Sequence, residues 1–253
     1  MIQEFQLNEL SHVKHVIGVM SGKGGVGKSS VSALIAVALA RRGHKVGVMD
    51  ADITGPSMPK MFGVSGQLEV NELGIFPAET EHLGIKIVSV NLMMDQEDAP
   101  VIWRAPLVTG MIKQFWTQVV WGDLDYVIID LPPGTSDVPL SVMQSIQLDG
   151  FIAVSSPQDV AAMVVRKSVN MANIMEKPVI GLVENMSYLA CPGCGKVIHP
   201  FGASTGAQQA EKLGIPFIGE MPIDPSLASL ADKGSVELYE HPMMDVLADA
   251  VER

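Results

Sequence analysis

The sequence of 253 residues has only two cysteines, Cys191 and Cys194, which rules out a framework of several disulfides. Their closeness in the stretch CPGC points to metal or redox chemistry instead. The sequence also lacks an apolar run of about 18 residues, the length that a membrane-spanning helix needs. Its acidic, mixed start MIQEFQLNEL is unlike a signal peptide, so we expect a soluble cytoplasmic protein with no membrane partner.

Basic residues are scarce as well. The sequence has 17 Lys and Arg against 28 Asp and Glu, and its formal net charge is -11. This charge repels a phosphate backbone, so we expect no nucleic-acid partner, although a local basic patch is compatible with it. Repeats, linkers and low-complexity stretches are absent too. Residues 1–253 are therefore predicted to form a single domain, with the CPGC loop at 190–196 inside it.

Short runs rich in Val and Ile alternate with helical patterns along the chain. This alternation predicts an α/β fold, a doubly wound and mostly parallel sheet with helices on both faces. The expected strands are 15–20, 45–50, 85–90, 126–131, 150–155, 178–183 and 216–221, and the expected helices are 28–43, 105–122 and 159–176. Residues 63–78 interrupt the alternation and are predicted to be a hairpin insertion.

The strongest chemical signal is SGKGGVGKSS, which follows the first expected strand and opens the first expected helix. It fits the P-loop pattern GxxxxGK(S/T) from Gly22 to Ser29. Glycines there let backbone amides point at phosphates, Lys28 opposes the β/γ charge, and the Ser29 hydroxyl can ligate Mg²⁺. The predicted ATP-binding residues are Gly22, Lys23, Gly24, Gly25, Val26, Gly27, Lys28, Ser29 and Ser30.

The sequence KGGVGKS, with its additional Lys23, resembles the deviant Walker A class of P-loop ATPases. The resemblance implies that Lys23 reaches across a homodimer interface to the partner's nucleotide and, with Lys28, takes part in catalysis; a merely solvated lysine is the alternative.

Two further stretches resemble the switch segments of the same class. DADITGPS is similar to switch I, which implies that Asp52 orients the attacking water while Asp50 supports the loop; a helix N-cap is the alternative for Asp52. VIIDLPPGTSD is similar to a Walker B strand with switch II. This implies that Asp130 reaches Mg²⁺ through water and that residues 132–134 sense the γ-phosphate.

From about residue 14 onward the chain resembles the Mrp/ApbC branch of these ATPases, which are carriers of iron–sulfur clusters. The resemblance rests on SGKGGVGKSS, DADITGPSMPKMFG, VIWRAPLVTGMIKQF, WGDLDYVIIDLPPGTSD, SSPQDVAAMVVRKSV and VENMSYLACPGCGK. It implies a homodimer whose two CxxC motifs hold one [4Fe–4S] cluster, with cluster donors and apo iron–sulfur proteins as partners. It also implies that Asn185 contacts the adenine.

The spacing of the cysteines leaves the metal open. Two copies of Cys191 and Cys194 supply four thiolates, which suit either a cubane cluster or tetrahedral zinc, and His199 is a candidate further ligand for a mononuclear site. A redox-active dithiol is less favoured. The resemblance favours the cluster. The rival functions are a MinD/ParA-like partitioning or positioning ATPase, a zinc-stapled nucleotide switch and, more weakly, a kinase.

Overall fold

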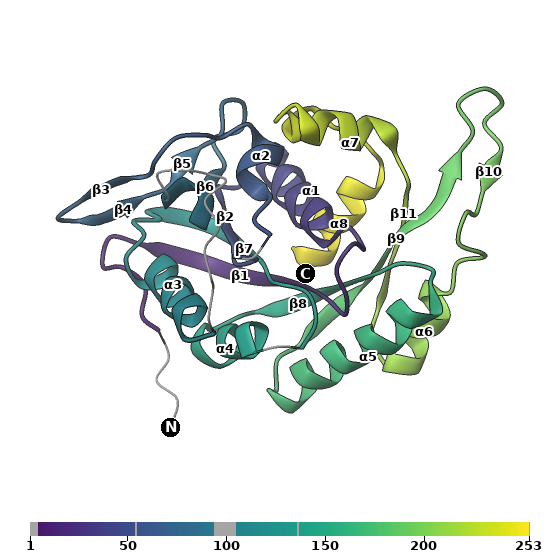
Figure 1. The fold of residues 1–253 in the computed structure, drawn as a ribbon, viewed down its shortest axis with the longest axis horizontal. Coiled ribbons are helices and arrows are strands. Elements are labelled where there is room, and N and C mark those ends of the chain that lie inside the picture. The colour runs from purple at the N-terminus through teal and green to yellow at the C-terminus, as the bar shows by residue number, and fades with distance from the viewer. Residues whose placement is uncertain (1–4, 54, 94–104, 136, 253) are drawn as a thin grey trace.

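A parallel sheet runs through the centre of the molecule (Figure 1). The structure is a computed structural model that describes residues 5–53, 55–93, 105–135 and 137–252. The parallel strands lie in the order β11–β9–β8–β1–β7–β2–β6. Their bounds are β1 His12–Ser21, β2 Val46–Asp50, β6 Lys86–Val88, β7 Asp123–Asp130, β8 Gly150–Ser155, β9 Val179–Ala190 and β11 Phe217–Pro222.

Four short strands complete the β structure. β5 (Ala78–Glu79) pairs antiparallel with β6 at one edge of the sheet, and β10 (Val197–Ile198) folds back antiparallel on the far end of β9. β3 (Glu69–Asn71) and β4 (Gly74–Phe76) form a separate antiparallel hairpin, as predicted for residues 63–78.

Helices cover both faces of the sheet, which confirms the predicted fold class (Figure 1). One face carries α1 Lys28–Arg41, α2 Met58–Phe62, α7 Pro225–Asp232 and α8 Met243–Val251, and the other carries α3 Ala105–Thr117, α4 Asp137–Ser145, α5 Asp159–Ile174 and α6 Gly206–Leu213. Two short 3₁₀ helices, η1 Val90–Met93 and η2 Val236–Leu238, link these elements. Among the described residues, no helix is both long and apolar enough to cross a membrane.

α1 is the most deeply buried helix. Its residues from Val31 to Leu39 are all buried, because the helix lies between the sheet and α8. A helix enclosed on all sides is apolar all round, which explains the run VSALIAVAL, in which Ser32 is the one polar residue. The same reasoning applies to β2 and β8, which are buried along their whole length because helices cover both faces of the sheet.

Two elements differ most in length from the sequence-based prediction. α3 ends at Thr117 rather than at residue 122, because the following residues lie extended beside the hairpin: Ile75 N donates to Gln118 O, and Val120 N donates to Ile75 O. β9 continues to Ala190, well beyond the expected end at 183. Its far half, residues 184–190, mixes polar and apolar residues and lacks the Val and Ile run of a buried strand, so the sequence pattern did not predict it.

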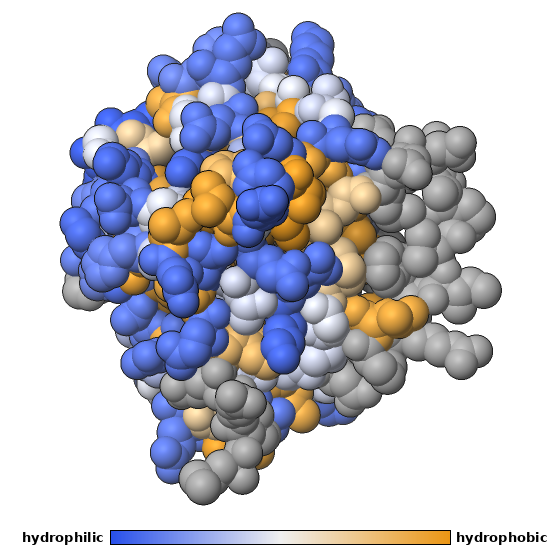
Figure 2. Space-filling view, turned by 90° about the vertical axis from the view of Figure 1, so that its left-hand side faces the viewer, coloured by the Kyte–Doolittle hydropathy of each residue, from blue (hydrophilic) through white to orange (hydrophobic). Residues whose placement is uncertain are grey.

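The β3–β4 hairpin stands on the side of the molecule shown in Figure 2. Apolar side chains gather near the centre of that face and hydrophilic ones surround them. Val70 and Leu73 of the hairpin region are exposed, as is Leu10 of the segment that Asn8 Nδ2 ties to Leu73 O. The hairpin therefore exposes Val70 and Leu73, whereas Ile75 of β4 is buried.

Candidate functional site

The predicted site residues of three strands meet at one edge of the sheet. The P-loop follows β1, Asp50 ends β2 and Asp130 ends β7. These three strands are parallel neighbours, with Asp50 paired to Asp130 and Val19 of β1 paired to Asp130 in the ladders. Ligands of open α/β sheets bind at the carboxyl ends of the strands, so the sheet itself gathers these residues at a candidate nucleotide site.

The P-loop requires glycine at two positions for different reasons. A Cβ on Gly22 would lie 2.4 Å from the carbonyl carbon of Val164 in α5, so only glycine allows the loop to approach that helix. Gly27 has φ +77° and begins α1, and that left-handed conformation favours glycine. Around Gly25, with φ +80°, a Cβ would meet nothing within 4 Å. The loop thus keeps its outer side open, and its backbone conformation fits a phosphate cradle.

Asp130 is fully buried at the base of this loop and is surrounded by hydrogen-bond donors. Lys28 Nζ lies 2.7 Å from Asp130 Oδ1, and the Ser29 hydroxyl donates to Oδ2 at 2.7 Å. The pairing of a serine hydroxyl with a carboxylate oxygen is a donor set that suits Mg²⁺. Ser29 and Asp130, predicted from separate motifs 101 residues apart, are therefore in direct contact.

Ser32 belongs to this cluster although the sequence analysis did not single it out. Its hydroxyl is buried and donates to Asp130 Oδ1 at 2.6 Å. A helix places residues four apart on one face, so the position of Ser32 one turn after Lys28 is the signal that identifies it.

Asp50 and Asp52 differ in their surroundings. Asp50 is fully buried and accepts backbone N–H bonds from Ser57 at 3.0 Å and Met58 at 3.2 Å. Burial, and then the nearby charge of Asp130, raises the pKa of Asp50 to about 7. Asp52 is less buried, and its Oδ2 lies 3.8 Å from Lys28 Nζ. Asp50 thus holds the loop in place, whereas Asp52 faces Lys28, the lysine that is predicted to bind phosphate.

The predicted switch II segment also lies against the P-loop. Gly134 N donates to Ser21 O at 2.8 Å, and a Cβ on Gly24 would be 3.9 Å from Pro133 Cγ. A conformational change in the loop that follows β7 would therefore directly alter the backbone of the P-loop.

Lys23 contacts its own chain. Its Nζ donates to the side-chain oxygen of Gln158, which stands at the N-terminal end of α5, and the lysine is half-buried. Gln158 is a second residue that the sequence analysis missed, because the contact spans 135 positions of the chain. The predicted reach of Lys23 to a partner subunit stays a prediction.

Asn185 contacts the P-loop from β9. Its amide Nδ2 donates to Val26 O at 2.9 Å, and both residues are buried. A Cβ on Gly27 would lie 2.1 Å from that same amide nitrogen, so the glycine makes room for Asn185 as well as for the turn. The structure thus places Asn185 against the P-loop, and its predicted contact with adenine stays a prediction.

Cys191 and Cys194 lie in the tight turn of the β9–β10 hairpin, which extends away from the body of the molecule (Figure 1). Cys191 N donates to Lys196 O at 2.9 Å and Gly195 N donates to Cys191 O at 2.8 Å, so the turn is closed by its own backbone. Backbone N–H groups of Gly193 and Cys194 lower the pKa of the Cys191 thiol. Cys194 is exposed and Cys191 is partly exposed, and the lowered pKa of Cys191 makes its metal-binding thiolate form easier to reach.

One chain supplies only two ligands at this turn. Within the part of the chain that the structure describes, no three His, Cys, Asp or Glu side chains come together to hold a metal ion. His199, the candidate further ligand, lies with Nδ1 3.2 Å from Ser187 O. A tetrahedral metal site or a cubane cluster here needs ligands beyond the two thiols of this turn.

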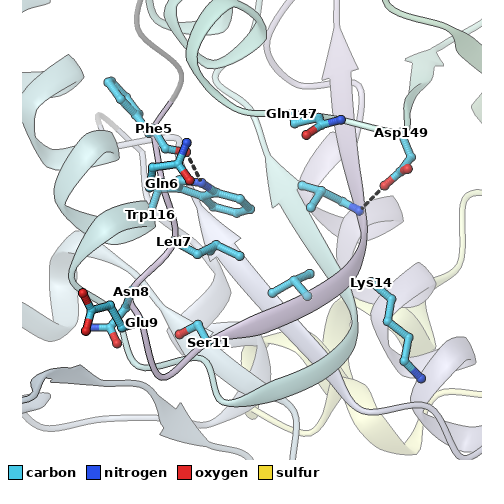
Figure 3. A pocket seen from close by; sticks show the side chains of 12 residues that line it. Phe5, Gln6, Leu7, Asn8, Glu9, Ser11, Lys14, Trp116, Gln147 and Asp149 are labelled. Carbon is cyan, nitrogen blue, oxygen red and sulfur yellow. Dashed lines mark hydrogen bonds between the residues drawn. The ribbon is translucent and has the colours of Figure 1, made fainter.

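A cavity of about 490 Å³ lies away from these residues, at the opposite end of β1 (Figure 3). It separates the N-terminal segment from the sheet and is bordered by Phe5, Leu7, Trp116 and Asp149. Two of its polar side chains bond within the chain: Trp116 Nε1 donates to Phe5 O at 3.2 Å, and Val16 N donates to Asp149 Oδ2 at 2.7 Å. We assign no ligand to it.

Comparison with known proteins agrees with this geometry. Residues 12–252 match the family model described as ParA, NUBPL iron-transfer P-loop NTPase. An iron–sulfur cluster carrier protein of Clostridium perfringens is 46% identical over 250 residues, covering 95% of this chain and 87% of the relative. The protein of that name from Methanocaldococcus jannaschii is 47% identical over 235 residues, covering 92% of this chain and 81% of the relative.

Solved structures show the same likeness. A nucleotide-binding protein of Archaeoglobus fulgidus in complex with ADP is 45% identical, with a TM-score of 0.82, over 92% of this chain and 91% of that one. The cell division ATPase MinD of Pyrococcus furiosus has a TM-score of 0.68 over 94% of this chain and 98% of that one. At 20% identity, MinD shares the fold, and the similarity carries no further conclusion.

Proposed function

This chain belongs to the ParA/NUBPL family of iron-transfer P-loop NTPases, and we propose that it is a Mg²⁺-dependent ATPase that carries a [4Fe–4S] cluster between proteins. The carried cluster is its cargo, bound between two copies of the chain and passed on to apo-proteins. The observation that carries the proposal is the pairing of an intact P-loop site with an exposed CPGC turn that offers only two of four ligands.

The nucleotide half of the proposal follows from the P-loop. Backbone amides of the glycine-rich loop and Lys28 Nζ bind the β- and γ-phosphates of ATP, and Lys28 then leaves its contact with Asp130. Ser29 and Asp130 would hold Mg²⁺, which would supply positive charge to neutralise the phosphates. Asp52, close to Lys28, positions the attacking water, and Lys23 from the second copy stabilises the charge that develops on the phosphates.

The cluster half follows from ligand number and chemistry. Four thiolates bind a cubane, and two copies of the CPGC turn supply them if the hairpins meet. The lowered pKa of Cys191 supports metal binding because thiolates, not thiols, are the ligands. The exposed apolar residues Val197, Ile198 and Phe201 beside the turn support a second copy there, because they would be covered when two hairpins pack together.

Metal analysis after anaerobic reconstitution tests this function. We expect about four irons and four sulfides per dimer, the content of one cubane. Cys191→Ser should abolish iron binding because it removes two of the four ligands in the dimer, while MgATP binding persists. A content near one zinc per dimer without sulfide would favour a zinc-stapled switch, and iron retained by the serine variant would contradict shared ligation.

A positioning ATPase of the MinD or ParA kind remains the rival function. It would use the same nucleotide residues but would have no need of the cysteines. Transfer of iron and sulfide from the loaded protein to an apo-enzyme separates the two, because only a carrier activates the recipient in proportion to the cluster that it loses.

A further inference from the structure

One strand connects the nucleotide site to the cysteines. β9 carries Asn185, whose side chain contacts the P-loop, and Cys191 follows the last residue of the same strand. An extended strand rises about 3.3 Å per residue, so roughly 20 Å of continuous backbone separates the two.

The strand is irregular at the point where it meets the P-loop. Glu184 pairs with Glu220 of β11, and the next pair is Tyr188 with Pro222, so a step of four residues in β9 faces a step of two in β11. The extra residues form a bulge at 185–187. Met186 within it has φ +58°, a strained conformation for a residue with a side chain. Bulges re-aim side chains near functional sites, and this one directs Asn185 to Val26.

Ser187 holds the other side of the bulge through its hydroxyl. Its Oγ lies 2.6 Å from Glu220 Oε2 and 3.1 Å from Glu184 Oε2. Glu184 is fully buried, and its second oxygen accepts a bond from Thr205 N at the start of α6. A single hydroxyl thus joins two carboxylates on neighbouring strands.

The backbone of Ser187 reaches the cysteine hairpin. Its carbonyl lies 3.2 Å from His199 Nδ1, and because a carbonyl can only accept, that nitrogen carries the proton. His199 follows β10, which pairs with β9 at Leu189 and Ala190 immediately before Cys191. Residues 185–187 are therefore in contact with the P-loop on one side and with the cysteine hairpin on the other.

We propose that this bulge relays nucleotide occupancy from the P-loop to the CPGC thiols, with Ser187 as a positioning residue. When the P-loop closes around phosphates, Val26 O moves and Asn185 moves with it. The strained backbone of the bulge deforms more readily than that of a regular strand. The movement of Asn185 therefore displaces Ser187, His199 and the hairpin. Linkage makes the effect reciprocal, so a metal on the thiols alters ATP affinity. The inference rests on the proposed function, because the relay matters only if the CPGC turn binds the carried cluster.

Thiol reactivity of the metal-free protein tests the relay. Alkylation of Cys191 and Cys194 by iodoacetamide is followed by mass spectrometry with and without Mg²⁺ and a non-hydrolysable ATP analogue. In the wild type, we expect the analogue to change the rate by about fivefold or more, the lower end of typical coupling between sites. Ser187→Ala should remove this change while the analogue still binds, and Ser187→Thr should restore it because threonine keeps the hydroxyl.

A second variant guards against misfolding of Ser187→Ala, which leaves Glu184 and Glu220 without their shared donor. His199 is exposed, so His199→Ala should fold, and it should also lose the response. His12→Ala, an exposed histidine at the start of β1, is the matched control and should respond as the wild type does.

Two outcomes overturn the relay: a wild type that binds the analogue without a change in thiol reactivity, and a full response in both Ser187→Ala and His199→Ala. The second outcome would place the coupling in dimer formation, which light scattering on the same samples detects. The assay needs no metal, so its result stays valid even if the protein fails to load a cluster. Equally, failure of the relay would not contradict the proposed cluster carriage.

Discussion

At the scale of single residues, two carboxylates two positions apart have separate tasks. Asp50 is enclosed by backbone donors and has a raised pKa, so it is suited to holding the loop after β2. Asp52 lies less deeply and faces Lys28. Only a carboxylate with access to the candidate phosphate site can orient a water molecule, so the tertiary environment favours Asp52 over Asp50 for the proposed chemical role.

We predict that Asp52→Asn binds ATP and hydrolyses it about a hundredfold more slowly, the usual cost of losing a positioned catalytic group. The amide keeps the shape but cannot accept a proton or attract the water as strongly. Fluorescent-nucleotide binding and single-turnover hydrolysis check both parts. Asp123→Asn, an exposed residue at the start of β7, is the control and should behave as the wild type does. A loss of ATP binding in Asp52→Asn would show that Asp52 serves the fold or the metal instead.

The cysteine turn yields a pH prediction. The pKa of Cys191 is lowered in the folded chain by N–H groups of Gly193 and Cys194 that favour the thiolate. As pH rises, Cys191 should therefore become reactive earlier in the folded protein than in the unfolded chain. The pH midpoint of iodoacetamide alkylation, measured for Cys194→Ser with and without denaturant, checks this, because that variant leaves one thiol and keeps the backbone donors. Equal midpoints would show that the turn does not tune the thiol.

At the scale of elements, α5 ends in a strained position. Glu176 follows the helix with φ +55°, and Lys177 N bonds back to Ala172 O, the arrangement in which glycine is usual. Glu176 is exposed, so its side chain contributes little packing. The backbone conformation of Glu176 is thus locally unfavourable, and the packing of the elements on either side maintains it.

Glu176→Gly should raise the free energy of unfolding by roughly 0.5–1 kcal/mol, the relieved strain less the added backbone entropy of glycine. For a chain of this size, the melting temperature should rise by about 2 °C. Glu211→Gly within α6 is the matched control, because the same replacement inside a helix should destabilise by about 1 kcal/mol. Calorimetry of both variants tests the pair, and a change of the same sign in each would refute the capping argument.

At the scale of the whole molecule, the role of Lys23 decides whether the ATP site is complete in one chain. In the structure, Lys23 binds Gln158 of its own chain, whereas the proposed dimer sends it to the other nucleotide. The two arrangements differ in a way that mixing of inactive variants can reveal.

Lys23→Ala and Lys28→Ala should each be nearly inactive alone, and a mixture should recover about a quarter of wild-type turnover if dimers exchange freely. In a mixed dimer, the Lys23→Ala chain keeps Lys28 and receives Lys23 from its partner, so one site of two is complete. Turnover is measured after refolding the two chains together. A mixture as inactive as its components would place Lys23 in its own chain's site.

Local sequence determined much of this molecule because the features concerned are built from neighbouring residues. The α/β alternation, the P-loop with Gly22, Lys28 and Ser29, and the hairpin around residue 72 depend on short backbone segments, and the structure shows all three. The limit appears where a segment's neighbours decide its state, as when Ile75 draws residues 118–120 out of the predicted helix.

The tertiary structure alone decided which distant groups meet. The hydrogen bond from Ser32 to Asp130, the contact of Lys23 with Gln158, and the bond from Asn185 to Val26 join positions between 98 and 159 residues apart. Periodicity and motifs describe a residue's own surroundings along the chain, whereas these contacts follow from the order of strands in the sheet. The parallel sheet brings the strand ends together at one edge, and the long β9 extends beyond that edge to the cysteine turn.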